Sequence, residues 1–214
     1  MLKDIKAAIF DLDGTLIDSM WIWEKIDVDF LKDKGFDMPK NLKDEINHLS
    51  FQETAHYFKN RFNLTDSIDS ILDTWHNMAL KHYTESVTLK DGALELLQYL
   101  KKSGIKIGLA TSNSTPLLEA GLRCVGIYDY FDAITTTDEA KKGKNNPDVY
   151  LLAANKLDTI PRECIVFEDI LEAVKGAKLA NMKVVAIYDK FAEYQNAELI
   201  NIADKYILNF HEIL

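Results

Sequence analysis

The chain has 214 residues and a mass of 24.4 kDa, and 47% of its residues are apolar. This is enough for one domain, or for a core domain with a small insert. It carries 25 Lys and Arg against 34 Asp and Glu, a formal net charge of −9. Such an acidic surface repels nucleic-acid phosphates and anionic lipids, so we expect neither nucleic acid nor membrane as a partner. A small anionic ligand remains compatible, because local donors and a metal can override the net field.

Targeting and redox signals are weak throughout the sequence. The first apolar run, Ala7 to Phe10, is far too short for a signal peptide, and no segment is long enough to span a membrane. Two cysteines are too few for a disulfide framework and fit a reducing compartment. These features favour a cytoplasmic protein, and we expect a monomer.

Short β-rich runs alternate with helical patterns over most of the chain. Several runs are apolar on both faces, which is typical of parallel strands covered by helices on each side. Between them, amphipathic stripes such as Leu94, Leu97 and Leu100 recur at helical spacing. This alternation predicts a doubly wound α/β sheet. The predicted strands are Ala7–Phe10, Ile105–Ala110, Ala133–Thr137, Cys164–Phe167, Val184–Tyr188 and a weaker Lys205–Leu208.

One region breaks the alternation, directly after the first strand. Residues 19–88 contain helical stripes, no convincing strand, and all three tryptophans. We interpret this block as an inserted helical domain, and residues 1–18 with 89–214 as the α/β core domain. The predicted stripes are Ile22, Ile26, Phe30; Phe51, Ala55, Phe58, Phe62; and Ile68, Leu72, Trp75, Ala79.

The first strand ends in two carboxylates, Asp11 and Asp13, followed by Gly14. Two acidic groups after a buried strand are costly unless a cation lies between them. A simple acidic turn is the alternative, because Asp-x-Asp-Gly also favours turns. An EF-hand does not fit, because its glycine comes at loop position six and helices flank its loop.

Polar groups follow other predicted strands in the same way. Thr111-Ser112-Asn113 carries hydroxyl and amide groups suited to phosphate oxygens, Lys144 precedes a helix, and Glu168-Asp169 ends a strand. Singly, these residues could be a helix N-cap, a solvated lysine and an acidic helix start. In an open parallel sheet, however, ligands bind at the carboxyl ends of the strands, so we expect all of them to converge.

These residues resemble the haloacid dehalogenase superfamily of phosphohydrolases, in the branch near β-phosphoglucomutase and small sugar-phosphate phosphatases. The resemblance covers nearly the whole chain, and it implies a Rossmann-like core with an inserted α-helical cap over residues 19–88. The family motifs are matched by Asp11-x-Asp13-Gly14-Thr15, Thr111, Lys144 and Glu168-Asp169.

The resemblance also implies a role for each matched residue. Asp11 becomes the nucleophile that forms an aspartyl-phosphate, and Asp13 the general acid and base. Mg²⁺ is expected on the Asp11 side chain, the Asp13 backbone carbonyl and Asp169, with Glu168 nearby. Thr111, Ser112 and Lys144 are expected to neutralise the phosphoryl oxygens. The implied substrate is a small phosphorylated metabolite.

The sequence departs from the family pattern at several positions, including Ala173 and Asn181 where glycine is usual. Asn145 follows the lysine where proline is usual, and Ile170 follows Glu-Asp where serine is usual. Trp23 stands where the mutase has a histidine, and Phe51 where it has an arginine that grips a second phosphate. Because an apolar ring cannot hold a phosphate, we expect a phosphatase rather than a mutase.

The substrate-facing residues of the cap are less defined. Trp23, Phe51 and His48, with Trp21, could form an aromatic wall over the site, or they could be core residues of the helical domain. Besides the mutase, two rival functions remain. A dehalogenase would not need Asp13, and a non-catalytic phosphometabolite sensor would usually have lost a nucleophile or metal ligand.

Overall fold

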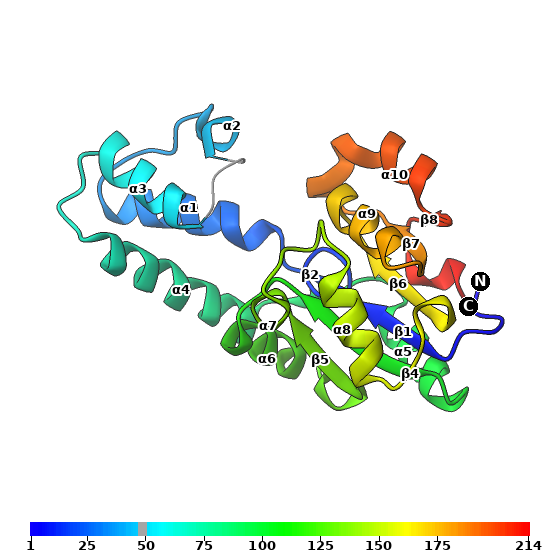
Figure 1. Ribbon diagram of the computed structural model, residues 1–214. Helices are drawn as coiled ribbons and strands as arrows, with labels where there is room; N and C mark the ends of the chain where they lie inside the picture. Colours follow the sequence, from blue (N-terminus) through cyan, green and yellow to red (C-terminus); the bar gives the residue numbers. More distant parts are fainter. Residues whose placement is uncertain (47–50) are drawn as a thin grey trace.

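The computed structural model describes residues 1–46 and 51–214, so His48 lies outside the described residues. Figure 1 shows a sheet lobe and a helical lobe, with both chain termini on the sheet lobe. The main sheet has the strand order β5-β4-β1-β6-β7-β8, and every neighbouring pair is parallel. Its strands are β1 (Ala7–Phe10), β4 (Lys106–Thr111), β5 (Ala133–Thr136), β6 (Cys164–Glu168), β7 (Lys183–Ile187) and β8 (Lys205–Ile207).

The predicted doubly wound α/β fold is confirmed, and each predicted strand agrees with the structure to within one residue at either end. The side chains of β1 show why the runs are apolar on both faces. Ala8 and Phe10 belong to one buried core, and Ala7 and Ile9 belong to the other. Successive side chains of a strand point to opposite faces, so each face needs its own cover.

Helices supply that cover on both sides of the sheet (Figure 1). Helices α5 (Ala93–Lys102) and α6 (Thr115–Cys124) share a core with one face, and α8 (Asp148–Lys156), α9 (Leu171–Leu179) and α10 (Asn196–Ile202) share a core with the other. The remaining turns of helix are α7 (Thr137–Ala140), η1 (Tyr128–Tyr130), η2 (Pro161–Glu163), η3 (Lys190–Gln195) and η4 (Phe210–Glu212).

The helical lobe packs around Trp75. Its helices are α1 (Trp21–Asp33), α2 (Leu42–Ile46), α3 (Phe51–Arg61) and α4 (Ile68–Glu85). The rings of Phe30, Phe51 and Phe58 lie 5.5, 5.5 and 5.0 Å from the Trp75 ring, so three helices meet at this residue. Sequence reasoning missed α2.

The predicted stripe of α4 is confirmed at Trp75 and Ala79, but its N-terminal residues are less deeply buried. The buried residues of this helix are Ile71, Trp75, Ala79 and Tyr83, whereas Ile68 and Leu72 are only partly buried. The most deeply buried edge of the helix shares Trp75 and Ala79 with the predicted stripe and continues to Tyr83, near the C-terminal end of α4.

Two short strands lie where the chain leaves and re-enters the sheet lobe. Strands β2 (Ile17–Asp18) and β3 (Thr88–Leu89) pair antiparallel, and neither was predicted, because two residues show no periodicity. Beyond them, α4 extends out of the helical lobe and packs against α6 (Figure 1). Within the described ranges, no helix combines the length and apolar character needed to cross a membrane.

Candidate active site

The predicted polar residues meet at one edge of the sheet. Asp11 directly follows β1, Thr111 ends β4, and Glu168 and Asp169 lie at the end of β6. Because β4, β1 and β6 are adjacent and parallel, their carboxyl ends lie side by side. The Asp11 amide also donates to the Phe167 carbonyl oxygen at 3.0 Å, which continues the ladder and fixes this turn.

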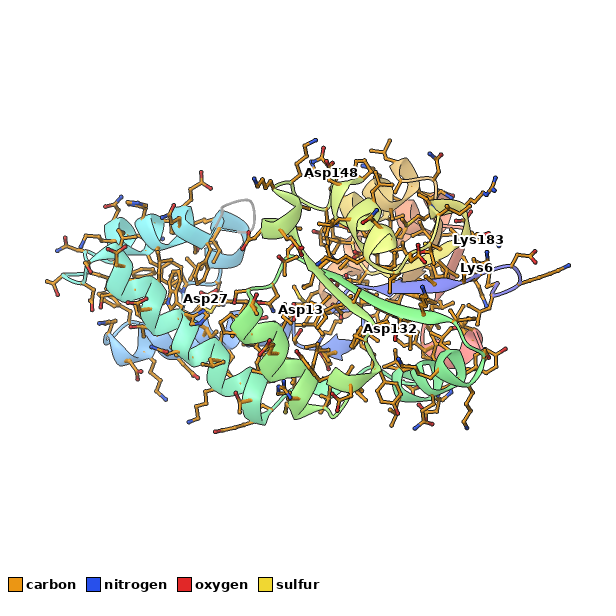
Figure 2. All side chains as sticks on the ribbon, turned by 60° about the horizontal axis from the view of Figure 1, so that its bottom comes forward. Lys6, Asp13, Asp27, Asp132, Asp148 and Lys183 are labelled. Atoms are coloured by element: carbon orange, nitrogen blue, oxygen red, sulfur yellow. The ribbon has the colours of Figure 1, made fainter. Side chains whose placement is uncertain are left out.

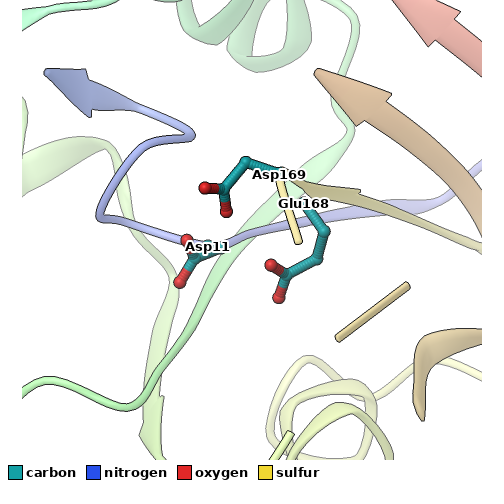
Figure 3. Close-up of side chains that lie close together, drawn as sticks. All are labelled: Asp11, Glu168 and Asp169. Atoms are coloured by element: carbon teal, nitrogen blue, oxygen red, sulfur yellow. The ribbon is translucent and has the colours of Figure 1, made fainter. Parts of the chain in front are cut away.

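Three buried carboxyl groups form the centre of the site. One carboxylate oxygen from each of Asp11, Glu168 and Asp169 lies within 4.8 Å of the other two, and Figure 3 shows the three side chains turned toward one another. Burial, followed by the charges of Asp11 and Glu168, raises the pKa of Asp169 well above its usual range. Burial also raises the pKa of Glu168 to about 7. Such groups ionise together only when positive charge is close.

Lys144 supplies part of that positive charge. Its Nζ contacts Asp11 Oδ1 and lies 2.7 Å from Glu168 Oε1. Burial opposes its charge, yet Asp11 and Glu168 outweigh burial and raise the pKa of Lys144 above its usual range. The Tyr150 hydroxyl lies 2.7 Å from the same Glu168 oxygen and holds this carboxylate from α8. Lys144 is therefore a fixed, charged ammonium group beside the expected nucleophile.

The cluster fits a hard divalent cation such as Mg²⁺. Glu168 Oε2 is buried and has no hydrogen-bond partner in the described part of the chain. Thr15 donates to Asp169 Oδ1 at 3.2 Å, and a Cβ on Gly14 would collide with Asp169 Oδ2, so this carboxylate lies against the turn after β1. One ammonium group among three carboxylates leaves excess negative charge, and oxygen ligands of this kind are those that Mg²⁺ prefers.

Gly176 is a site feature that sequence reasoning missed. It lies in the middle of α9, where a built Cβ would come within 1.9 Å of the Lys144 carbonyl oxygen and 2.9 Å of the Asn146 carbonyl oxygen. The loop that carries Lys144 therefore packs directly on the helix backbone. An isolated glycine inside the apolar pattern of residues 171–180 was the available signal.

Asp13 lies in a second cluster, at the junction of the two lobes (Figure 2). Its Oδ1 accepts from Ser19 Oγ at 2.6 Å and from the Tyr83 hydroxyl. Its Oδ2 accepts from Asn113 Nδ2 at 2.8 Å, and this amide also lies 3.1 Å from the Tyr83 oxygen. Burial, then the charge of Asp11, raises the pKa of Asp13. The sequence did not predict that Ser19 and Tyr83 contact this carboxylate.

The two predicted hydroxyls after β4 differ in placement. Thr111 is buried, and its Oγ1 accepts from the Asn113 amide at 3.0 Å. Ser112 is exposed, and the cap position of α6 is taken by Ser114. The structure therefore does not support the alternative in which Thr111 is a helix N-cap.

The predicted cap residues are partly core. The Trp23 and Phe51 ring centroids lie 5.8 Å apart, and Phe51 also packs against Trp75. Phe51 nevertheless remains 45% exposed, while Trp23 is half-buried. The third predicted residue, His48, is outside the described ranges.

Comparison with known proteins now identifies the family. A family model described as haloacid dehalogenase-like hydrolase matches residues 8–187. The chain belongs to this family. Hexitol phosphatase B of Escherichia coli K12 is 28% identical over 214 residues, covering 99% of this chain and 95% of that protein. The β-phosphoglucomutase of Bacillus subtilis is 32% identical, covering 86% of this chain and 83% of that protein.

Solved structures agree with the sequence relatives. A crystal structure of a Thermotoga maritima protein, provisionally named a β-phosphoglucomutase, superposes with a TM-score of 0.85. It is 26% identical and covers 94% of each chain. The predicted family is confirmed, and so is the predicted enzyme class, a phosphomonoester hydrolase of this family.

Proposed function

We propose that this enzyme is a Mg²⁺-dependent phosphatase that hydrolyses a small phosphorylated metabolite, a sugar phosphate or close analogue, through an aspartyl-phosphate. The observation that carries the proposal is the buried cluster of Asp11, Glu168 and Asp169 with Lys144 at the strand ends. The hexitol phosphatase relative supports the substrate class. The helices of residues 19–88 serve as the cap, with Trp23 and Phe51 facing the substrate.

In the first half-reaction, an Asp11 carboxylate oxygen attacks phosphorus, and the bond from phosphorus to the ester oxygen of the substrate breaks. Asp13 gives its proton to the leaving oxygen. The resulting acyl phosphate stays on Asp11. In the second half-reaction, Asp13 takes a proton from a water molecule whose oxygen attacks phosphorus. The bond from phosphorus to the Asp11 oxygen breaks, which releases inorganic phosphate and regenerates the Asp11 carboxylate.

The remaining residues neutralise and hold the phosphoryl group. Lys144, Thr111 and Ser112 offer an ammonium group and two hydroxyls to its oxygens. Asp11, the Asp13 backbone carbonyl and Asp169 would hold Mg²⁺, with Glu168 nearby, and the ion would supply the positive charge that lets an anionic phosphate approach carboxylates.

A phosphomutase is the second candidate, favoured by the 32% identity to the Bacillus subtilis β-phosphoglucomutase. A mutase holds two phosphates at once. The position where the mutase has its phosphate-binding arginine is Phe51 in this chain, and the ring beside it is that of Trp23. Neither ring can neutralise a phosphate. Interconversion of β-glucose 1-phosphate and glucose 6-phosphate separates the two candidates, because robust turnover would establish the mutase.

The direct test is phosphate release from a panel of phosphorylated metabolites with Mg²⁺ or EDTA. Asp11→Asn removes the nucleophile and should abolish release. Asp158→Asn is the matched control: Asp158 is exposed and has a φ of 50°, which Asn also adopts, so activity should persist. Release that survives in Asp11→Asn would overturn the aspartyl-phosphate route. No release by the wild-type protein from any substrate would favour the mutase or the non-catalytic sensor.

A further inference from the structure

A tyrosine from the helical lobe reaches the carboxyl group expected to transfer protons. Tyr83 lies in the last turns of α4, is fully buried, and donates its phenol hydroxyl to Asp13. Helix α4 has 18 residues and is about 27 Å long, with its other end in the helical lobe. One rigid element thus connects the helical lobe to Asp13.

Packing fixes the position of the Tyr83 ring. A Cβ built on Gly121 of α6 would lie 3.1 Å from Tyr83 Cδ1, closer than a Cβ normally comes to another atom. The absent side chain of Gly121 therefore leaves the space in which the ring lies. A ring held this closely gives its hydroxyl a defined location rather than a range of positions.

The donors also divide the two oxygens of Asp13 between them. Ser19 and Tyr83 donate hydrogen bonds to Oδ1, and Asn113, in the loop after β4, donates one to Oδ2. The Asn113 Nδ2 group can only donate, whereas both hydroxyls can either donate or accept. Donors on both oxygens restrain rotation of the carboxyl group, while the hydroxyls can adapt to both of its protonation states.

We propose that Tyr83 is a positioning residue of the reaction: its hydroxyl, together with Ser19 and Asn113, orients the Asp13 carboxyl group for proton transfer to the leaving oxygen. This inference rests on the role proposed above for Asp13. Tyr83 itself need not touch the substrate, and it acts through the orientation of its partner. The alternative is that Tyr83 is a buried residue whose hydroxyl only needs a hydrogen-bond acceptor and has no role in the reaction.

Leaving-group dependence separates the two explanations. A sugar alkoxide needs a proton as it leaves, whereas the phenolate of p-nitrophenyl phosphate leaves without one. The ratio kcat/KM covers only the steps through phosphoryl transfer to the enzyme, so later hydrolysis does not obscure the comparison. Tyr83→Phe should lower kcat/KM for a hexose phosphate about tenfold, which is a fraction of the total contribution of general-acid catalysis to the rate. It should lower kcat/KM for p-nitrophenyl phosphate less than about twofold, because that leaving group needs no proton.

Three further variants sharpen the test. Gly121→Ala displaces the Tyr83 ring while keeping its hydroxyl. It should lower kcat/KM for the hexose phosphate, relative to kcat/KM for p-nitrophenyl phosphate, about threefold, and this effect should vanish in a Tyr83→Phe background. Tyr57→Phe is the matched control, because it removes another phenol-to-carboxylate hydrogen bond, to Glu45 inside the helical lobe. Its kcat/KM ratio for the two substrates should stay at the wild-type value. Asp13→Ala tests the underlying role on its own.

The outcomes are distinguishable. If Asp13→Ala lowers kcat/KM for both substrates equally, the role proposed for Asp13 is wrong. If Asp13→Ala discriminates between the substrates but Tyr83→Phe does not, only the inference about Tyr83 is overturned. Should Tyr83→Phe fail to fold, the ratio in Gly121→Ala decides: selective loss on the hexose phosphate supports positioning, and an unchanged ratio refutes it.

Discussion

Gly176→Ala adds one methyl group where the active-site loop meets α9. Gly176 carries no catalytic group, but its built Cβ would lie 1.9 Å from the Lys144 carbonyl oxygen, whereas ordinary contact begins at 3.4 Å. The Lys144 carbonyl oxygen and α9 must therefore move apart by about 1.5 Å, because the oxygen belongs to the loop backbone and the added Cβ is fixed to the helix backbone, so neither atom can rotate away.

The displacement should cost more activity than stability. A misplacement of about 1 Å in catalytic geometry can cost about 100-fold in rate, so we expect kcat/KM to fall by about two orders of magnitude. Crowding of a packed interior costs about 1–3 kcal/mol, while alanine is favoured over glycine inside a helix by about 1 kcal/mol. The net loss in free energy of unfolding should therefore lie between about 0 and 2 kcal/mol.

Both quantities are measurable on the same preparation. Phosphate release from a hexose phosphate gives kcat/KM, and urea denaturation gives the free energy of unfolding. Leu179→Ala is the control on the same helix, because its side chain is 64% exposed, and both values should stay near wild type. Wild-type kinetics in Gly176→Ala would refute the reasoning, since they would mean that the position of Lys144 does not limit turnover.

Three other expectations follow from burial and charge. Burial and the neighbouring Glu24 raise the pKa of Asp27 to about 7. Its carboxyl group therefore stabilises the fold fully below its unfolded pKa near 3.8, and this contribution is lost as the pH rises through 7. In urea denaturation, Asp27→Asn should raise the free energy of unfolding by up to about 4 kcal/mol at pH 8 and leave it unchanged near pH 3. Tyr150→Phe should cost about 1–3 kcal/mol, because it removes the hydroxyl that donates to Glu168, and an unchanged urea midpoint would contradict this. Mg²⁺ at 100 times its Kd should stabilise the wild-type protein by about 2.7 kcal/mol over EDTA, seen as a rise in Tm, and Asp169→Asn should abolish the difference.

The part of the site built on strand ends was predictable from sequence. Short apolar runs located β1, β4 and β6, and the polar residues at the ends of these runs are Asp11, Thr111 and Glu168. In a parallel sheet these ends share one edge whatever the details of helix packing. The convergence of the acidic cluster therefore needed no knowledge of tertiary structure beyond strand order.

The partners of Asp13 could not be predicted in the same way. Tyr83 reaches Asp13 only because α4 turns its Ile71-to-Tyr83 edge inward and crosses α6 at Gly121. Helical periodicity allows several neighbouring edges, and it favoured the edge that begins at Ile68. Which edge is buried depends on how two distant segments pack, which local sequence does not encode.

The two halves of the site thus differ in what holds them. Asp11, Lys144 and Glu168 are fixed by strand ends and by the backbone of α9, all within the sheet lobe. Asp13 is held by donors from the sheet lobe and by Tyr83 from α4. A shift of α4 would therefore move the Tyr83 hydroxyl that contacts Asp13 without disturbing Asp11, the expected nucleophile. Changes in the helical lobe that shift α4 should consequently alter the leaving-group dependence of kcat/KM well before they alter Mg²⁺ affinity, whereas changes that leave α4 in place should alter neither.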